Sequence, residues 1–314
     1  MLSKRSTSHS CHDSGIKLLS LDFDDTCTSK DTTSLFYKAT NKYRFGTKEE
    51  KRRLDEQWSK HAEEYGTGLV SVQDKAFSRL EGSTTSPGFN DKGLREFLKT
   101  IGEFGLNISR NVESDGLLQG ITSEGIQAVA KDVELQHSCL ETLSHFRNCQ
   151  VISINWSSEI IYFKLGIEKA RIHANSFPVK DGKSTGKIDR TMRTAFDKER
   201  VFKKLVNESR SQGVTIFIGD SLTDLLALLA ADFGIIVGQS RSLRKVLGVS
   251  GISLRPLSEV NDTNCSRASH TLYEACSWMQ IQSFLNEVNS NESKKIKNIP
   301  ESSEEQHIED ESLS

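Results

Sequence analysis

The chain has 314 residues, enough for about two domains, and its 41 Lys and Arg against 43 Asp and Glu give a formal net charge of −2. A charge so close to zero argues against a general nucleic-acid binder, which normally carries a basic excess. No run reaches the ~18 apolar residues that a membrane-spanning helix needs, so we expect no membrane partner. Residues 1–15 are polar and are predicted to form a disordered tail.

Four short apolar runs predict buried strands. They cover residues 17–22, 150–154, 214–219 and 233–237. Runs of this length that are apolar throughout are typical of a parallel sheet covered on both faces. Helical patterns between the later strands cover residues 158–165, 197–210 and 222–231. This alternation of strands and helices predicts an α/β fold with a doubly wound parallel sheet.

A long segment separates the first two strands. It is predicted to be helical, with helices around residues 31–41, 48–65, 69–80, 91–104 and 134–147. A crossover between parallel strands needs only ~30 residues, so the segment is predicted to be an inserted α-helical cap domain. The predicted division is a tail at 1–15, a core at 16–31 and 148–288, a cap at 32–147, and an acidic disordered tail at 289–314.

Carboxylates follow two of the predicted strands. The first ends in Asp22, with Asp24 two residues further on, and Asp220 and Asp224 follow the third. In a parallel sheet the carboxyl ends of the strands lie at one edge, and ligands bind there. These side chains are therefore expected to meet at that edge. Such carboxylates repel one another, and a hard divalent cation with oxygen ligands, Mg²⁺, would compensate them. Lys198, at the start of the helix before the third strand, is a candidate for a further compensating charge.

These segments resemble the motifs of the haloacid-dehalogenase (HAD) superfamily of phosphotransferases. The D-x-D-x-T motif matches Asp22, Asp24 and Thr26, and the serine that closes an apolar strand matches Ser153. Lys198 matches the lysine of the third motif, and Gly219, Asp220 and Asp224 match G-D-x-x-x-D. All four motifs occur in order, each at the expected element.

The resemblance implies a mechanism and a set of roles. Asp22 would be the nucleophile that forms an aspartyl-phosphate, and Asp24 would be the general acid and base. The implied phosphate-binding residues are Thr26, Ser153, Asn155 and Lys198. The implied Mg²⁺ ligands are Asp22, the backbone carbonyl of Asp24, Asp220 and Asp224. The helical insertion implies a cap over the site and therefore a small phosphomonoester substrate.

Each of these residues also has a structural interpretation. Lys198 lies among other basic residues and is alternatively a surface charge. Ser153 is alternatively a small residue at a strand end, with Asn155 and Ser157 as substitutes for its role. Ser221-x-x-Asp224 also fits a helix capping box. Cys27 is expected to be a buried, inert thiol, one of six cysteines without a C-x-x-C pair, as is typical of a reducing compartment.

A narrower resemblance is carried by LLSLDFDDTCT, QVISINWSSEII, RIHANSF, STGKI and the stretch from TIFIGDSLTD to SLRKV. These segments resemble the phosphatase half of plant bifunctional thiamin-salvage proteins, in which a HAD phosphatase is fused to a TenA-type domain. The resemblance implies hydrolysis of thiamin monophosphate. A broader small-molecule phosphatase, acting on nucleotides, pyridoxal phosphate or sugar phosphates, is one alternative, and an inactive HAD-like ligand-binding module is another.

The aromatic residues of the insertion have two interpretations. Trp58, Tyr65, Phe89 and Phe104 could stack on a cationic heterocycle, or could pack in the core. We expect a cytoplasmic protein, with organelle targeting by the N-terminal tail as the alternative, and the sequence leaves the oligomeric state open.

Overall fold

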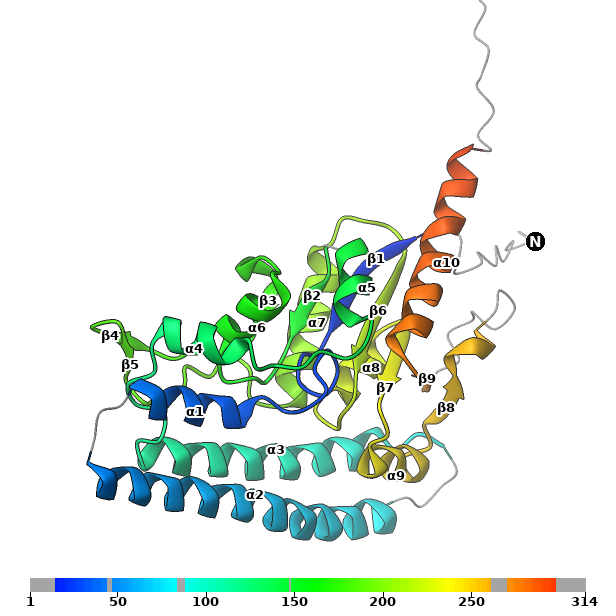
Figure 1. Ribbon diagram of the computed structural model, residues 1–314. Coiled ribbons are helices and arrows are strands. Elements are labelled where there is room, and N and C mark those ends of the chain that lie inside the picture. Colours follow the sequence, from blue (N-terminus) through cyan, green and yellow to red (C-terminus); the bar gives the residue numbers. More distant parts are fainter. Residues whose placement is uncertain (1–14, 44–46, 84–87, 147, 261–269, 298–314) are drawn as a thin grey trace, which may run out of the picture.

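The structure is a computed structural model that describes residues 15–43, 47–83, 88–146, 148–260 and 270–297. At its centre is a parallel sheet whose seven strands, within these ranges, are ordered β3-β2-β1-β6-β7-β9-β8 (Figure 1). The strands of this sheet are β1 (Ile16–Leu21), β2 (Gln150–Ile152), β3 (Ile172–His173), β6 (Val214–Gly219), β7 (Phe233–Val237), β8 (Ser253–Pro256) and β9 (Thr271–Ala275). The four strands predicted from apolar runs are neighbours within it, and the doubly wound α/β fold is confirmed.

Both faces of the sheet are covered, which explains why its central strands are mostly apolar. Successive side chains of a strand point to opposite faces. In β6, accordingly, Ile216 and Ile218 belong to one apolar cluster and Phe217 to the other. Among the helices that contribute to the two clusters are, on one face, α6 (Ser158–Leu165) and α10 (Trp278–Lys297), and on the other α7 (Ala195–Glu208), α8 (Leu225–Ala230) and α9 (Arg241–Val249).

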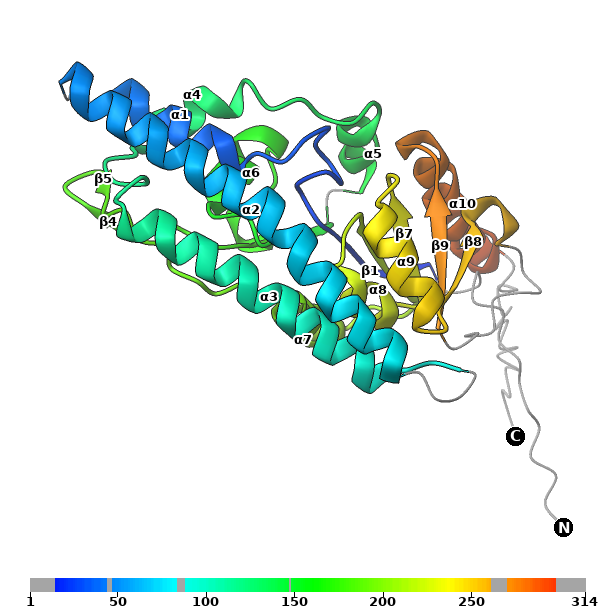
Figure 2. The same cartoon turned by 90° about the horizontal axis from the view of Figure 1, so that it is seen from below.

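The chain between β1 and β2 is helical, as expected. Its helices are α1 (Thr33–Tyr43), α2 (Lys48–Ser83), α3 (Asp91–Ser114), α4 (Ser123–Ala130) and α5 (Cys139–His145). The long helices α2 and α3 run antiparallel, side by side (Figures 1 and 2). A small antiparallel hairpin, β4 (Val179–Lys180) and β5 (Lys183–Ser184), and short 3-10 turns at Lys169–Arg171 and Leu257–Glu259 complete the described elements.

The prediction of two helices at 48–65 and 69–80 was wrong, because α2 is continuous through both. Gly68, which lies between the two predicted helices, has a role in helix packing. A Cβ atom on Gly68 would lie 2.7 Å from Cζ of Phe104, so the missing side chain lets the α3 ring approach α2 closely.

The predicted domain boundaries stay predictions. Residues 1–14 and 298–314, in the two predicted tails, lie outside the described residues. The predicted boundary at residue 289 falls within α10, which continues to Lys297. Helix α5, predicted as part of the cap, contacts α10 beside the sheet. Among the helices that are described, none combines the length and apolarity required to cross a membrane.

Candidate active site

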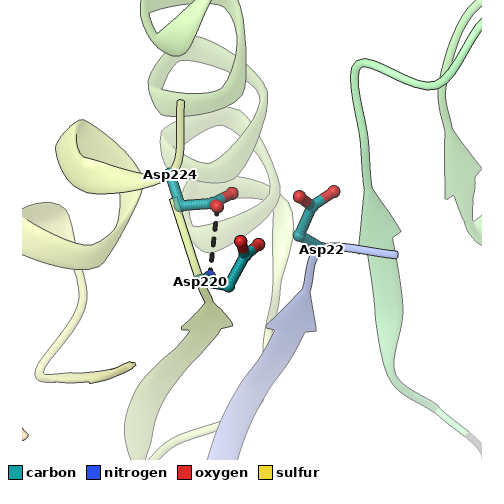
Figure 3. Close-up of side chains that lie close together, drawn as sticks. All are labelled: Asp22, Asp220 and Asp224. Carbon is teal, nitrogen blue, oxygen red and sulfur yellow. Dashed lines mark hydrogen bonds between the residues drawn. The ribbon is translucent and has the colours of Figure 1, made fainter. Parts of the chain in front are cut away.

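Three carboxylates meet at the carboxyl edge of the two central strands. Asp22 directly follows β1 and Asp220 directly follows β6, and the backbone N–H of Asp22 donates to the Ile218 carbonyl oxygen at 2.9 Å. Asp224 lies at the start of α8. One carboxylate oxygen from each residue lies within 4.8 Å of the others. Figure 3 shows the three side chains gathered at the ends of the strands, as the sequence predicted.

Lys198 supplies a buried positive charge beside two of these carboxylates. Its Nζ lies 2.9 Å from Oδ2 of Asp22 and 2.6 Å from Oδ1 of Asp224, and the residue is 0% exposed. Burial disfavours the charged lysine, but the two carboxylates outweigh burial and raise the pKa of Lys198. A capping box between Thr194 and Asp197 begins α7 and so fixes the position of Lys198. The alternative that Lys198 is a surface charge is wrong.

One ammonium group does not balance three carboxylates. Burial, then repulsion from Asp224, raises the pKa of Asp22 to about 6 despite Lys198. Burial and the same repulsion raise the pKa of Asp220 to about 9. Oδ1 of Asp22 is also buried without a hydrogen-bond partner among the described residues. A cation with a preference for oxygen ligands would satisfy this oxygen and lower the repulsion, so the residues fit Mg²⁺.

Asp224 makes both kinds of contact considered from the sequence. It belongs to the carboxylate cluster, and it accepts hydrogen bonds from the backbone, as in a capping box. Its Oδ2 accepts hydrogen bonds from the backbone N–H groups of Ser221, at 3.1 Å, and Asp220, at 3.3 Å. Figure 3 marks the second of these bonds. Close approach is permitted by Gly219, where a Cβ atom would lie 2.6 Å from Cβ of Asp224. The turn after β6 and the charge cluster therefore depend on the same side chain.

Asp24 is held by two residues on the other side of the site. Its Oδ1 accepts hydrogen bonds from the backbone N–H of Thr32 at 2.9 Å and from the Thr32 hydroxyl at 2.7 Å. Its Oδ2 accepts one from Nδ2 of Asn155 at 2.7 Å. Burial, then the charges of Asp31 and Asp22, raises the pKa of Asp24 to about 7, against these hydrogen bonds. A carboxyl group with a pKa near neutrality suits proton transfer in both directions.

Both the side chain and the backbone carbonyl of Thr26 make hydrogen bonds to other residues of the chain. Its hydroxyl donates to Oδ1 of Asp220 at 3.0 Å, its side chain is buried, and its carbonyl oxygen accepts from Nε1 of Trp278 on α10 at 2.9 Å. Thr26 therefore orients a carboxylate here. Ser153, in contrast, lines the cavity described below, and its hydroxyl accepts from the backbone N–H of Asn155 at 3.2 Å.

Cys27 is buried, as expected. Its thiol donates to the Asp22 carbonyl oxygen at 3.2 Å. Burial raises the pKa of this thiol well above its ordinary value, which makes Cys27 a poor nucleophile.

A cavity of about 500 Å³ opens onto these groups. At one end it is lined by Asp22, Asp24, Asp220, Ser153 and Lys198. Away from these groups, α2 and α3 contribute mostly apolar side chains, such as Leu69, Leu98, Ile101 and Leu106, together with His61. A site with a charged end and an apolar end suits a phosphate ester with a largely apolar leaving group.

Two tryptophans in the cavity wall are each paired with an aromatic residue of α1. Trp58 stacks on Tyr37 with ring centroids 4.9 Å apart, and Trp156 stacks on Phe36 at 6.2 Å. Of the other aromatic residues considered from the sequence, Tyr65 lines the cavity and stacks on Phe104, whereas Phe89 stacks on His270 and is not part of the wall. Trp156 was missed, although it follows Asn155 directly.

Sequence reasoning also missed Arg190 and His61 in the wall. Nη1 of Arg190 lies 2.9 Å from Oε2 of Glu113, and Nε2 of His61 lies 2.8 Å from Oδ2 of Asp115. Both contacts connect distant segments, so no local pattern in the sequence indicated them.

No protein-family model matches the chain. The parallel sheet and the carboxylates at its carboxyl edge agree with the arrangement that the resemblance to HAD-like phosphatases implies. The chain is similar to the bifunctional TH2 protein, mitochondrial, of Arabidopsis thaliana, with 28% identity over 258 residues. The match covers 74% of this chain, which spans only 40% of the TH2 protein. This finding agrees with the similarity to plant bifunctional proteins expected from the sequence.

Other proteins resemble the chain more distantly. The CTO1 family protein C17G9.12c of Schizosaccharomyces pombe is 23% identical over 301 residues, which cover 83% of this chain and 97% of that protein. A solved structure described as a phospho-aspartyl intermediate analogue of phosphoserine phosphatase aligns with a TM-score of 0.48 and 16% identity, covering 86% of this chain and 99% of that one.

Proposed function

We propose that the chain is a Mg²⁺-dependent phosphomonoester hydrolase that works through an aspartyl-phosphate on Asp22. The observation that carries the proposal is the state of that carboxylate. Asp22 lies in the cavity wall, with Oδ2 in contact with Lys198 and Oδ1 buried without a hydrogen-bond partner among the described residues. An unpartnered buried carboxylate oxygen is costly unless a cation or a reacting atom contacts it.

The proposed reaction has two halves. In the first, a carboxylate oxygen of Asp22 attacks phosphorus, the bond from phosphorus to the ester oxygen breaks, and Asp24 donates its proton to the leaving alcohol. In the second, Asp24 takes a proton from water while the water oxygen attacks phosphorus. The bond from phosphorus to Asp22 then breaks, and inorganic phosphate leaves.

The remaining residues bind and orient. Lys198 holds Asp22 in place and, with Ser153, faces the phosphoryl oxygens. Asp22, the carbonyl oxygen of Asp24 and Asp220 would hold Mg²⁺, with Asp224 beside them. When bound, the cation would offset the negative charge of the carboxylates and the phosphoryl group.

For the substrate we propose thiamin monophosphate. The similarity to the TH2 protein supports it. So does the apolar end of the cavity, where Trp58 and Trp156 offer aromatic surface to a cationic heterocycle. A broader phosphatase acting on nucleotides, pyridoxal phosphate or sugar phosphates remains the alternative, and an inactive ligand-binding module is the alternative from another class.

The test is phosphate release from thiamin monophosphate by the purified chain, with Mg²⁺ or with a chelator, beside Asp22→Asn. This substitution removes the nucleophile and preserves its shape, so we expect release to fall by several orders of magnitude. Turnover of p-nitrophenyl phosphate, nucleotides and sugar phosphates at equal or higher efficiency would discard thiamin monophosphate and keep the phosphatase. Binding without release from any ester would favour the inactive module.

The location in the cell is a separate proposal. We keep the expectation of a cytoplasmic protein, and fluorescence microscopy of the chain tagged at its C-terminus tests it. Accumulation in an organelle would favour targeting by the N-terminal tail, in line with the TH2 protein, which is described as mitochondrial.

A further inference from the structure

Every hydrogen-bonding group of the Asn155 side chain is engaged. Oδ1 accepts a hydrogen bond from the backbone N–H of Ser157 at 3.0 Å. Nδ2 donates to Oδ2 of Asp24 at 2.7 Å and to Oγ1 of Thr32 at 2.8 Å. A backbone N–H can only donate, so the atom facing Ser157 is the amide oxygen and the NH₂ group faces Asp24. Both amide hydrogens are used, which leaves none to donate to a phosphate.

The same contacts determine which atom of Asp24 can carry a proton. A carboxylate offers about four acceptor positions, two on each oxygen. The backbone N–H and hydroxyl of Thr32 occupy both positions on Oδ1, and Asn155 occupies one on Oδ2. One position is left, on Oδ2, and Asp24 lines the cavity.

We infer that Asn155, together with Thr32, is a positioning residue that directs proton transfer through the remaining position on Oδ2 of Asp24. The inference rests on the proposed function, in which Asp24 is the acid and the base. It replaces the expectation that Asn155 binds phosphate. Asn155 is 6% exposed and Thr32 is 2% exposed, so bulk water has little access to the hydrogen bonds that these two side chains make.

If Asn155 and Thr32 position Asp24, their loss should affect the two halves of the reaction differently for different esters. An alkyl phosphate needs a proton on its leaving oxygen, whereas p-nitrophenolate leaves without one. Water needs Asp24 as a base whichever ester formed the aspartyl-phosphate. When Asp24 is poorly positioned, p-nitrophenyl phosphate should still phosphorylate Asp22, and only the hydrolysis of the aspartyl-phosphate should be slow.

The experiment is rapid mixing of Asn155→Ala with excess p-nitrophenyl phosphate and Mg²⁺. We expect a burst of about one p-nitrophenolate per active site followed by turnover slowed about 100-fold or more, the usual scale of general acid–base catalysis. Thiamin monophosphate should give no burst of thiamin and a loss of at least the same size. Thr32→Val should behave similarly, and Thr32→Ser, which keeps the hydroxyl, should recover most of the rate.

The matched control is Asn175→Ala. Asn175 is also buried, and its side chain makes two hydrogen bonds, against three for Asn155, both of them to the backbone, at Ile154 and Met192. A merely structural effect would slow both esters by one factor without a burst, as we expect for this control. The same behaviour in Asn155→Ala and Thr32→Val would overturn the inference and leave the proposed function intact. A wild-type chain that hydrolyses no phosphate ester would overturn both.

Discussion

Replacement of Lys198 by methionine tests the electrostatics of the site directly. Lys198→Met removes the ammonium group that lies 2.9 Å from Asp22 and 2.6 Å from Asp224, and it keeps an unbranched side chain of similar length. Two buried carboxylates would then lack their compensating charge. Removal of one partner from a buried ion pair costs about 3–5 kcal/mol. In proteins somewhat smaller than this one, each kcal/mol of lost stability lowers the melting temperature by roughly 2–4 °C, so the melting temperature should fall by about 6–20 °C.

The assay is thermal unfolding in the presence of a chelator, so that no divalent cation replaces the lost charge. Lys203→Met is the matched control, because Lys203 lies one turn and a half further along α7, pairs with Glu199 at 2.6 Å and has a side chain that is 57% exposed. A surface pair of this kind contributes at most about 1 kcal/mol. If Lys198→Met and Lys203→Met melted at the same temperature, the buried charge cluster would not have the energetic weight we assign to it.

Two further predictions concern the same cluster. Without a divalent cation, the pKa of Asp220 is raised to about 9 in the folded chain, which therefore binds a proton at Asp220 more tightly than the unfolded chain does. The free energy of unfolding should therefore fall as the pH rises from about 4 to 9. Addition of Mg²⁺ should therefore raise the melting temperature more at pH 8.5 than at pH 6, and an equal increase at both values would contradict cation binding at these carboxylates. Gly219→Ala places a Cβ atom 2.6 Å from Cβ of Asp224 and should weaken both Mg²⁺ binding, measured by calorimetry, and phosphate release. Gly248→Ala in α9, where an added Cβ atom would meet nothing within 4 Å beyond the nearby backbone of its own helix, should stabilise the chain by up to about 1 kcal/mol, and a similar gain from Gly219→Ala would refute the close packing described here.

The sequence predicted the elements that carry a strong local signal. β6 and β7 were predicted with their observed bounds, because each is a short and almost entirely apolar run between turns. The edge strands β8 (SLRP) and β9 (TLYEA) were missed. They mix polar and apolar residues, and they become strands through their pairing with each other and with β7.

The same limit applies to the site. The spacing of Asp22, Asp24, Asp220 and Asp224 indicated a carboxylate cluster, because strand ends of a parallel sheet share one edge. Spacing could not show that Thr26 and Asn155 would contact other side chains of the site. Those contacts depend on loops that are brought together only by the completed sheet.

The hydrogen bond from Trp278 to the carbonyl oxygen of Thr26 joins residues 252 positions apart. At about 5–20 residues per second, a ribosome needs about 13–50 s to synthesise that length. For most of this time β1 lacks β6, its partner over most of its length, because β6 is synthesised late in the interval. An apolar strand with open edges can pair with other chains, so the nascent protein should depend on chaperones that shield β1. The loop that carries Asp22 and Asp24 reaches its final form only after Trp278 has been synthesised.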